Sequence, residues 1–255
     1  MTRRRPLVTA LGAGVHLVTG TNVNWAVVSE GASVTLVDTG YPNDAGLLVD
    51  SLAMLGHRPE AVEAVLLTHA HLDHLGGVPV LRRLRPGPVL TGHEEARHAR
   101  REYLEQISLR EMAGLTVDAA GRRWVARTLR AVLPHAAVRL TDVTGVDDGR
   151  RLDLPGGPVP VVVGGHTPGH TCWLLPDRGA LFSGDALVTH HPVARTGVGP
   201  QLLPSVFNAD DAATASALTA MRDLPADLLI PGHGPAHRGA LATAVDAALA
   251  DRRSG

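Results

Sequence analysis

The segment that most constrains this chain is residues 68–77, which read THAHLDHLGG directly after an apolar run. Its imidazole and carboxylate groups are the side chains that hold zinc-like divalent cations in proteins. His69 and His71 stand two residues apart, so an extended segment or a tight loop can aim both at one ion. Asp73 and His74 follow directly and would point elsewhere, which suggests a second ion nearby. A histidine-rich surface loop is the alternative, but this spacing rarely arises by chance among 14 histidines in 255 residues.

Three further ligand-type residues each follow an apolar run and a sharp turn. His170 lies in the loop GGHTPGHT of residues 164–171, Asp185 ends the run LFSGD, and His233 follows the run LLIPG. Strands that end in turns place functional side chains along one rim of a sheet. Each of these residues alone would more often be an ordinary turn residue. Together with the first motif, they favour a shared metal site.

In their order along the chain, these residues resemble those of the metallo-β-lactamase-fold hydrolase superfamily, and the match covers nearly the whole chain. The resemblance implies an α/β fold, a four-layered αββα sandwich, with two divalent metal ions at one edge. It assigns His69, His71 and His170 to the first ion and Asp73, His74 and His233 to the second, with Asp185 as a bridge.

The resemblance also implies residues that support the site without binding metal. Asp38, in the run TLVDTG, matches an aspartate at the end of an early strand of the superfamily. It is expected to hold the ligands in place. His166, four residues before His170, is expected to stabilise its turn by hydrogen bonding.

Two adjacent cations determine the expected chemistry. Each lowers the pKa of a shared water toward neutrality, which provides a bridging hydroxide. One metal polarises a carbonyl or phosphoryl oxygen, while Asp73 is the catalytic residue that orients the hydroxide and relays its proton. We expect a zinc-dependent hydrolase, with iron or manganese as alternative metals, that cleaves a small ester-type substrate such as a thioester or a lactone. A phosphodiesterase of the same fold and a non-catalytic metal- or ligand-binding module are the alternatives.

Two departures from the superfamily's better-known members bear on the substrate. The zinc β-lactamases lack the bridging aspartate, so Asp185 argues against antibiotic hydrolysis as the main role. The quorum-quenching lactonases use a tyrosine near the site, but Tyr41 and Tyr103 are the only tyrosines here, and neither follows His170. The sequence therefore leaves the substrate open.

Candidate substrate contacts follow the bridging aspartate closely. His190, His191 and Arg195 are the residues of this loop that would bind a carboxylate or stabilise an oxyanion. An exposed histidine is more often simply solvated, which is the alternative for each.

A helical insertion is predicted at about residues 94–133, with helices over 94–107 and 119–132. Long insertions often form a lid over a cleft or a dimer contact, and a solvated helical hairpin is the alternative. Met112, Leu115 and Trp124 are the side chains that a lid would turn toward the pocket.

The composition fits one domain over residues 1–255, with 44% hydrophobic and 19% charged residues and no linker tract. A formal net charge of -1 gives no general attraction for nucleic acid or an anionic membrane, so the expected partner is a small-molecule substrate, with a homodimer as the candidate assembly. The single Cys172 excludes an internal disulfide. Residues 3–5 are arginines but lack the apolar stretch and cleavage site of a secretory signal, and no run is long enough to span a membrane. We therefore expect a cytoplasmic protein.

Alternating apolar runs and turn residues predict a mixed order of strands and helices. Strands are expected over residues 15–18, 24–29, 33–37, 64–67, 159–163, 171–175, 180–183 and 227–230. Helices are expected over 44–55, 77–84, 210–222 and 236–250, in addition to the two in the insertion.

Overall fold

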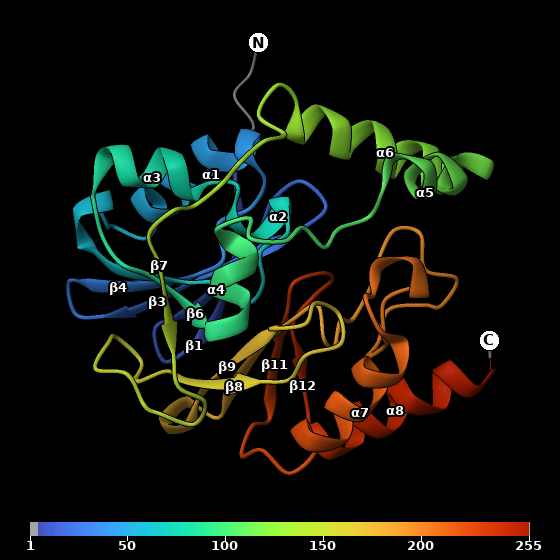
Figure 1. Cartoon of the computed structure of the whole chain (residues 1–255). Helices are drawn as coiled ribbons and strands as arrows, with labels where there is room; N and C mark the ends of the chain where they lie inside the picture. Colours follow the sequence, from blue (N-terminus) through green and yellow to red (C-terminus); the bar gives the residue numbers. More distant parts are fainter. Residues whose placement is uncertain (1–4, 255) are drawn as a thin grey trace.

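The computed structural model describes residues 5–254 and shows two β-sheets stacked between layers of helices (Figure 1). This is the α/β, four-layered αββα sandwich that the resemblance implied. Residues 1–4 and 255 of the predicted domain, and with them Arg3 and Arg4 of the N-terminal arginine run, lie outside the described residues.

The first sheet has, within the described residues, seven strands in the order β1-β2-β3-β4-β5-β6-β7. The first four are antiparallel to one another, whereas β5, β6 and β7 run parallel to β4. Parallel pairing brings the carboxyl ends of β4 and β5 to the same edge. The strands are β1 (Leu7–Gly12), β2 (Val15–Thr19), β3 (Asn24–Glu30), β4 (Ser33–Val37), β5 (Val62–Leu66), β6 (Val89–Gly92) and β7 (Val143–Val146).

The second sheet has five strands in the part of the chain that the structure describes, in the order β12-β11-β10-β9-β8. Here β10 and β11 are parallel, and the other neighbours are antiparallel. The carboxyl ends of β10 and β11 therefore also share one edge. The strands are β8 (Val159–Val162), β9 (Thr171–Leu175), β10 (Ala180–Gly184), β11 (Leu228–Pro231) and β12 (His237–Arg238).

The helices flank the sheets and fill the connections. The α-helices are α1 (Ala45–Met54), α2 (Leu72–Leu75), α3 (Val78–Leu84), α4 (His93–Ala99), α5 (Leu109–Gly114), α6 (Ala119–Val132), α7 (Asp211–Met221) and α8 (Leu241–Ser254). Short 3-10 helices are η1 (Pro42–Asp44), η2 (Pro59–Ala61), η3 (Leu115–Val117), η4 (Pro176–Arg178) and η5 (Ser205–Phe207).

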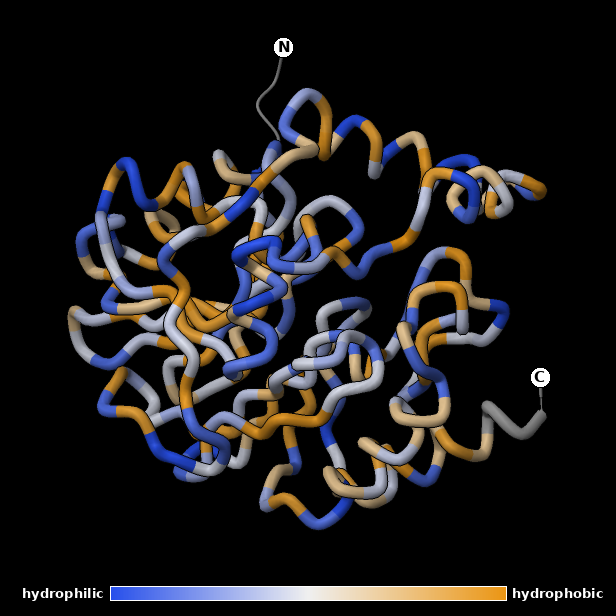
Figure 2. The backbone as a smooth tube through the Cα atoms, viewed as in Figure 1, coloured by the Kyte–Doolittle hydropathy of each residue, from blue (hydrophilic) through white to orange (hydrophobic). Residues whose placement is uncertain are grey.

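Side chains that alternate along the strands build three apolar layers. Leu17 of β2 and Trp173 of β9 point into the space between the two sheets. Their neighbours point outward, Val18 toward the side of α1 and α3 and Leu174 toward the side of α7 and α8. Figure 2 shows that hydrophobic residues are frequent along the segments that run through the interior. This alternation of period two fixes the register of the strands within each sheet, because a shift by one residue would turn every side chain to the opposite face.

The expected strands are all confirmed, with ends that shift by at most two residues from the predicted ranges. The structure adds β1, β6, β7 and β12, which were not predicted. The closing helix begins at Leu241 rather than at residue 236, because the chain first forms β12 against β11. Among the described residues, no helix is long and apolar enough to cross a membrane.

The insertion between β6 and β7 differs from its prediction in the first half. The helix expected over residues 94–107 ends at Ala99, and Arg101 adopts a φ of 58°, which an α-helix cannot accommodate. The chain then runs to α5, whose first turn is closed by a capping box between Ser108 and Glu111. The second helix, α6, covers the predicted residues, and Figure 1 shows α5 and α6 projecting from the body of the molecule.

Candidate metal centre

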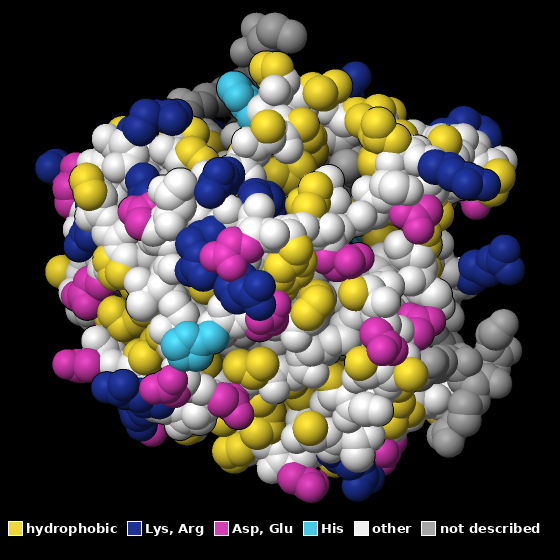
Figure 3. All heavy atoms as spheres, viewed as in Figure 1, with side chains coloured by type: hydrophobic (Ala, Val, Ile, Leu, Met, Phe, Trp, Pro, Cys, Tyr) yellow, Lys and Arg dark blue, Asp and Glu magenta, His cyan; other side chains and the backbone are white. Residues whose placement is uncertain are grey.

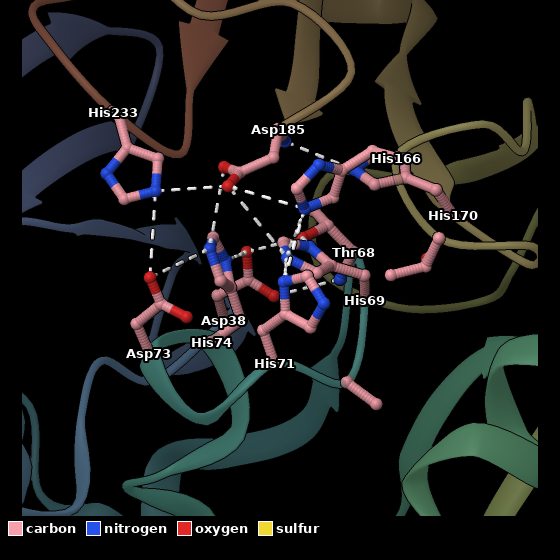
Figure 4. Close-up of polar contacts among 12 residues, drawn as sticks. Asp38, Thr68, His69, His71, Asp73, His74, His166, His170, Asp185 and His233 are labelled. Atoms are coloured by element: carbon pink, nitrogen blue, oxygen red, sulfur yellow. Dashed lines mark hydrogen bonds and ion pairs between the residues drawn. The ribbon is translucent and has the colours of Figure 1, made fainter. Parts of the chain in front are cut away.

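The predicted ligands meet where the carboxyl ends of two parallel strand pairs face each other. In the first sheet, Asp38 follows β4 and the segment 68–77 follows β5. In the second sheet, Asp185 follows β10 and His233 lies just beyond β11. The carboxyl ends of parallel strands are the usual place for ligands in α/β proteins. Each sheet thus supplies half of one site (Figure 4).

Three imidazole nitrogens converge in a small triangle. His69 Nε2 lies 3.0 Å from His71 Nδ1, and His166 Nε2 lies 3.2 Å from each of these atoms. Asp185 Oδ2 is close by, at 3.6 Å from His166 Nε2 and 3.9 Å from His69 Nε2. Three imidazoles with a nearby carboxylate form a donor set that suits a tetrahedral zinc ion.

His166, and not the predicted His170, supplies the third imidazole of this triangle. His170 lies directly before β9, with its ring stacked on that of His69. Its Nε2 accepts a hydrogen bond from the main-chain N–H of Asp185 at 3.1 Å. The structure thus departs from the predicted grouping, because the loop turns the second histidine of GGHTPGH toward the Asp185 backbone. It brings His166, and not His170, together with His69 and His71.

A second group forms around Asp73, as the sequence predicted. Asp73 Oδ2 lies 3.8 Å from His74 Nε2 and 3.6 Å from His233 Nε2. Asp185 reaches the same group, with Oδ1 at 3.5 Å from His74 Nε2 and Oδ2 at 3.0 Å from His233 Nε2. Asp185 therefore lies between the two groups, where a carboxylate shared by two ions would stand.

Asp38 holds two of the histidines from behind. His74 Nδ1 donates to its Oδ2 at 2.8 Å, and Thr68 donates both its main-chain N–H and its hydroxyl to the same carboxylate, each at 2.8 Å. Because the Thr68 hydroxyl is used as a donor there, it accepts from His69 Nδ1 at 3.1 Å. Both imidazoles are thereby oriented with Nε2 toward the site, where it would bind a cation once His74 has given up its second proton; metal-binding histidines are usually fixed in this way. These contacts agree with the supporting role predicted for Asp38.

Two further histidines are oriented in the same way. His166 Nδ1 donates to Asn208 Oδ1 at 3.0 Å, and the Asn208 amide is itself fixed by its hydrogen bond to Asp211. His233 Nδ1 donates to the main-chain oxygen of Asn22 at 2.6 Å. In both cases Nε2 faces the cluster, where that of His233 lies 3.0 Å from Asp185 Oδ2, so four imidazoles aim this nitrogen into the same small space.

Buried atoms at the centre lack partners within the described chain. His74 Nε2 and Asp185 Oδ1 make no hydrogen bond although both atoms are buried. An unpaired buried polar group costs ~1–3 kcal/mol, so proteins normally pair such atoms with protein, water or metal. A Cβ at position 232 would collide with Asp185 and His74. Because Gly232 has no side chain, this space stays open. The donor set and the unpaired atoms together fit divalent cations.

The electrostatics of the cluster follow from burial and from its carboxylates. Burial holds the pKa of His69 and of His71 well below the ordinary value for histidine, so both are neutral, the form that binds metal. Burial acts against the charged form of His74 as well, but Asp185 and Asp38 outweigh it and raise the pKa of His74 well above its ordinary value. Burial alone would raise the pKa of Asp185, yet His233 and His74 hold it well below its usual range.

Glu95 positions the site and was missed from the sequence. It is fully buried, and its Oε1 accepts hydrogen bonds from the main-chain N–H of Ala70 and from His98 Nδ1, both at 2.7 Å. Its Oε2 accepts from the Thr167 hydroxyl at 2.7 Å. Ala70 lies inside the first histidine motif, and Thr167 directly follows His166, so one carboxylate ties two ligand loops together. The sequence offered one signal, because Glu95 and His98 stand three residues apart and can pair on one face of a helix. The charged residues around them instead led to the prediction of a solvated helix face.

A cavity of about 550 Å³ opens onto the cluster. Asp73 and Asp185 form part of its inner end, and residues of the insertion form much of its wall. Met112 and Trp124 line the cavity, as expected for a lid, whereas Leu115 does not belong to its lining. The insertion therefore lies over the site.

Of the three residues predicted as substrate contacts, only His191 lines this cavity. It is buried among aromatic rings, with ring centroids 4.8 Å from Phe207 and 5.1 Å from His233, and burial holds its pKa well below the ordinary value. His190 lines a neighbouring cavity of about 450 Å³, and Arg195 is exposed and lines neither. The structure therefore does not bring His190 and Arg195 to this cavity, and a contact of either residue with substrate stays a prediction.

Comparisons with known proteins agree with this geometry. The chain is 27% identical over 239 residues to the probable metallo-hydrolase YflN of Bacillus subtilis (strain 168), which covers 87% of this chain and 84% of that protein. It is 27% identical over 174 residues to the atrochrysone carboxyl ACP thioesterase of Emericella nidulans, which covers 67% of this chain but only 42% of that protein. A solved metallo-β-lactamase of Cronobacter sakazakii (Enterobacter sakazakii) with a HARLDQ motif has the same fold, with a TM-score of 0.69, 19% identity, and coverage of 98% of this chain and 94% of that chain. The sequence profile of the metallo-beta-lactamase superfamily matches residues 18–233, and the chain therefore belongs to that superfamily.

Proposed function

We propose that this protein is a hydrolase that depends on two divalent ions, with zinc as the first candidate, and that it cleaves a thioester or a lactone. The observation that carries the proposal is a set of three overlapping groups of possible ligands, in which His69, His74 and Asp185 form the group that joins the other two. The first ion would be held by His69, His71 and His166, the second by Asp73, His74 and His233, and Asp185 would contact both.

The residues of the chain supply most of the proposed mechanism. When bound, two cations would polarise a substrate carbonyl and make a water acidic enough to attack near neutral pH. Asp73 lines the cavity beside His233, and its carboxylate would orient that water and carry its proton to the leaving group. Asp38 and the main-chain oxygen of Asn22 keep His74 and His233 aimed at the site. The apolar cavity wall excludes bulk water from the reacting carbonyl.

Two observations favour a carboxylic ester or thioester over a phosphodiester. The relative from Emericella nidulans is named as a thioesterase. Among the described residues, the lining of the 550 Å³ cavity contains no arginine that would pair with a charged phosphodiester backbone. A neutral carbonyl substrate avoids the cost of burying an unpaired charge there.

The test combines metal analysis with a substrate panel. The purified, metal-loaded protein should contain two ions per chain and should hydrolyse thioesters or lactones. His71→Ala should lose both metal and activity, whereas His93→Ala, whose side chain is 68% exposed, is the matched histidine control and should retain both. Turnover of phosphodiesters alone would favour the phosphodiesterase, and stoichiometric metal without any turnover would favour a binding module. Full metal content and activity in His71→Ala would refute the proposed site.

A further inference from the structure

The cavity in front of the cluster is polar only at its inner end. Its walls are formed mainly by aliphatic and aromatic side chains from the insertion and from the segment around η5. The insertion contributes Leu104, Leu109, Met112, Trp124, Leu129 and Leu133. A mostly apolar lining with a few convergent polar groups is typical of a small-molecule site.

The apolar wall continues from the interior to solvent. Met112 and Trp124 are only 9% and 5% exposed, whereas Leu104 and Leu109 are 58% and 78% exposed. Figure 3 shows hydrophobic side chains gathered over the upper part of the molecule, where α6 runs in Figure 1. Exposed apolar side chains that continue the lining of a pocket form a binding surface, because covering them with a ligand removes apolar area from water and so favours binding.

Helix α6 separates this apolar cavity from a charged one. Trp124 and Thr128 line the cavity at the cluster, whereas Arg127 and Arg130 line a separate cavity of about 900 Å³. The guanidinium groups are thus kept away from the site. A substrate with a charged acyl group would be desolvated against this wall without a partner, whereas an alkyl chain would be stabilised by it.

We infer that the cavity is an acyl pocket, and that the substrate is a thioester of an aliphatic acid whose chain lies along the insertion and whose carbonyl lies at the cluster. This inference rests on the proposed hydrolase function and names its substrate class. In the reaction, the oxygen of water adds to the carbonyl carbon and the C–S bond breaks. The sulfur leaves as a thiol with one proton of the water, and the products are a carboxylic acid and a thiol.

The first experiment is a chain-length series on the metal-loaded protein. The probes are S-acyl N-acetylcysteamine thioesters from acetyl to decanoyl, which differ only in the number of methylene groups. Each methylene that enters the pocket should raise kcat/KM by about four-fold, the value that corresponds to burial of one CH₂, until the chain reaches the mouth. A flat series would overturn the inference and leave the proposed hydrolase intact.

A matched pair of variants places the effect in the insertion. Leu109 and Val117 are 78% and 83% exposed and lie in the same insertion, but only Leu109 lines the cavity. Leu109→Asp should lower the ratio of decanoyl to acetyl kcat/KM by about 10-fold or more, because it places a charge against the chain. Val117→Asp should keep the wild-type ratio. Equal ratios in both variants would contradict the proposed path of the acyl chain.

Binding of a thioether separates the pocket from the chemistry. S-decyl N-acetylcysteamine has no carbonyl, so it can bind without being hydrolysed, and Trp124 in the cavity wall reports binding by its fluorescence. The change should be absent in Trp124→Phe, and affinity should rise with alkyl length. If neither thioesters nor lactones are hydrolysed but this dependence is found, the hydrolase proposal fails and the apolar pocket stands. If no alkyl thioether binds, the inference fails whatever the enzyme hydrolyses.

Discussion

Replacing Glu95 with glutamine tests whether one buried carboxylate holds two ligand loops in position. Its Oε1 accepts from Ala70 and His98, and its Oε2 accepts from the Thr167 hydroxyl. Glutamine keeps the shape and one acceptor oxygen, so the first two bonds can persist. Its amide nitrogen would face the Thr167 hydroxyl, which must rotate to accept instead of donating. All three bonds lose the assistance of a charge.

The expected loss follows from these three bonds. A hydrogen bond to a charged group contributes ~1.5–3 kcal/mol, and a neutral one ~0.5–1.5 kcal/mol. A reduction of about 1 kcal/mol for each bond lowers the free energy of unfolding of Glu95→Gln by roughly 3 kcal/mol. Because the loops carry the ligands, metal affinity should also fall ~10–100-fold, as for other changes just outside a ligand set.

Urea unfolding and a metal titration measure both effects, and the neighbouring Glu94→Gln is the control. Glu94 pairs with Arg97 at 3.0 Å on the surface, where an ion pair contributes only ~0–1 kcal/mol. Glu94→Gln should therefore unfold and bind metal much as the wild type does. If Glu95→Gln matches Glu94→Gln in both measurements, the network does not position the ligands and the reasoning is refuted.

Four further outcomes are expected. His166→Ala should lose one ion per chain by elemental analysis, whereas His170→Ala should keep both with affinity reduced ~10–100-fold; equal loss would contradict the assignment. Asp185→Asn removes a charge shared by both groups and should lower metal affinity and kcat by at least ~10-fold, so full activity would make it a mere turn residue. The raised pKa of His74 leaves it protonated in the metal-free protein at neutral pH, so metal binding should release a proton and strengthen as pH rises, which calorimetry in two buffers detects; binding without proton release would contradict this. Removing metal with a chelator should lower the free energy of unfolding by about 2.7 kcal/mol relative to protein at a metal concentration ~100 times Kd, and unchanged urea unfolding would argue against metal in the folded state.

The sequence located the first ligand motif because its chemistry is local. His69, His71, Asp73 and His74 lie in one turn after one strand, and their spacing is sufficient to identify them. The choice between His166 and His170 is not local. The main-chain oxygen of His166 accepts from the N–H of Ala209, a residue far along the chain, and this contact helps to set the path of the loop. Spacing alone carries no information on such a contact.

Tertiary contacts also overrode the local preference of the insertion. Residues 94–107 have a helix-forming composition, yet the helix stops because Arg101 turns into the body of the protein. Its guanidinium donates to the main-chain oxygens of Ala70 and Val138 at 3.0 and 3.1 Å. Helix propensity amounts to a few tenths of a kcal/mol per residue, so two such bonds at a partly buried position can end a helix. The short strands β6 and β7 were missed for a related reason, since their parallel pairing spans the whole insertion.

The insertion therefore has a root and a tip with different physical roles. At the root, Ala70 is held from both sides, since its N–H donates to Glu95 and its oxygen accepts from Arg101. The hydrogen-bond network of the root also extends toward the cavity. His98, which is bonded to Glu95, accepts a hydrogen bond from the main-chain N–H of Glu105, a residue next to the cavity wall. At the tip, α5 and α6 supply apolar side chains and no ligands. We therefore expect changes at the tip to alter which substrate is accepted without disturbing the His/Asp cluster. Changes at the root should shift two loops of that cluster relative to each other and affect both.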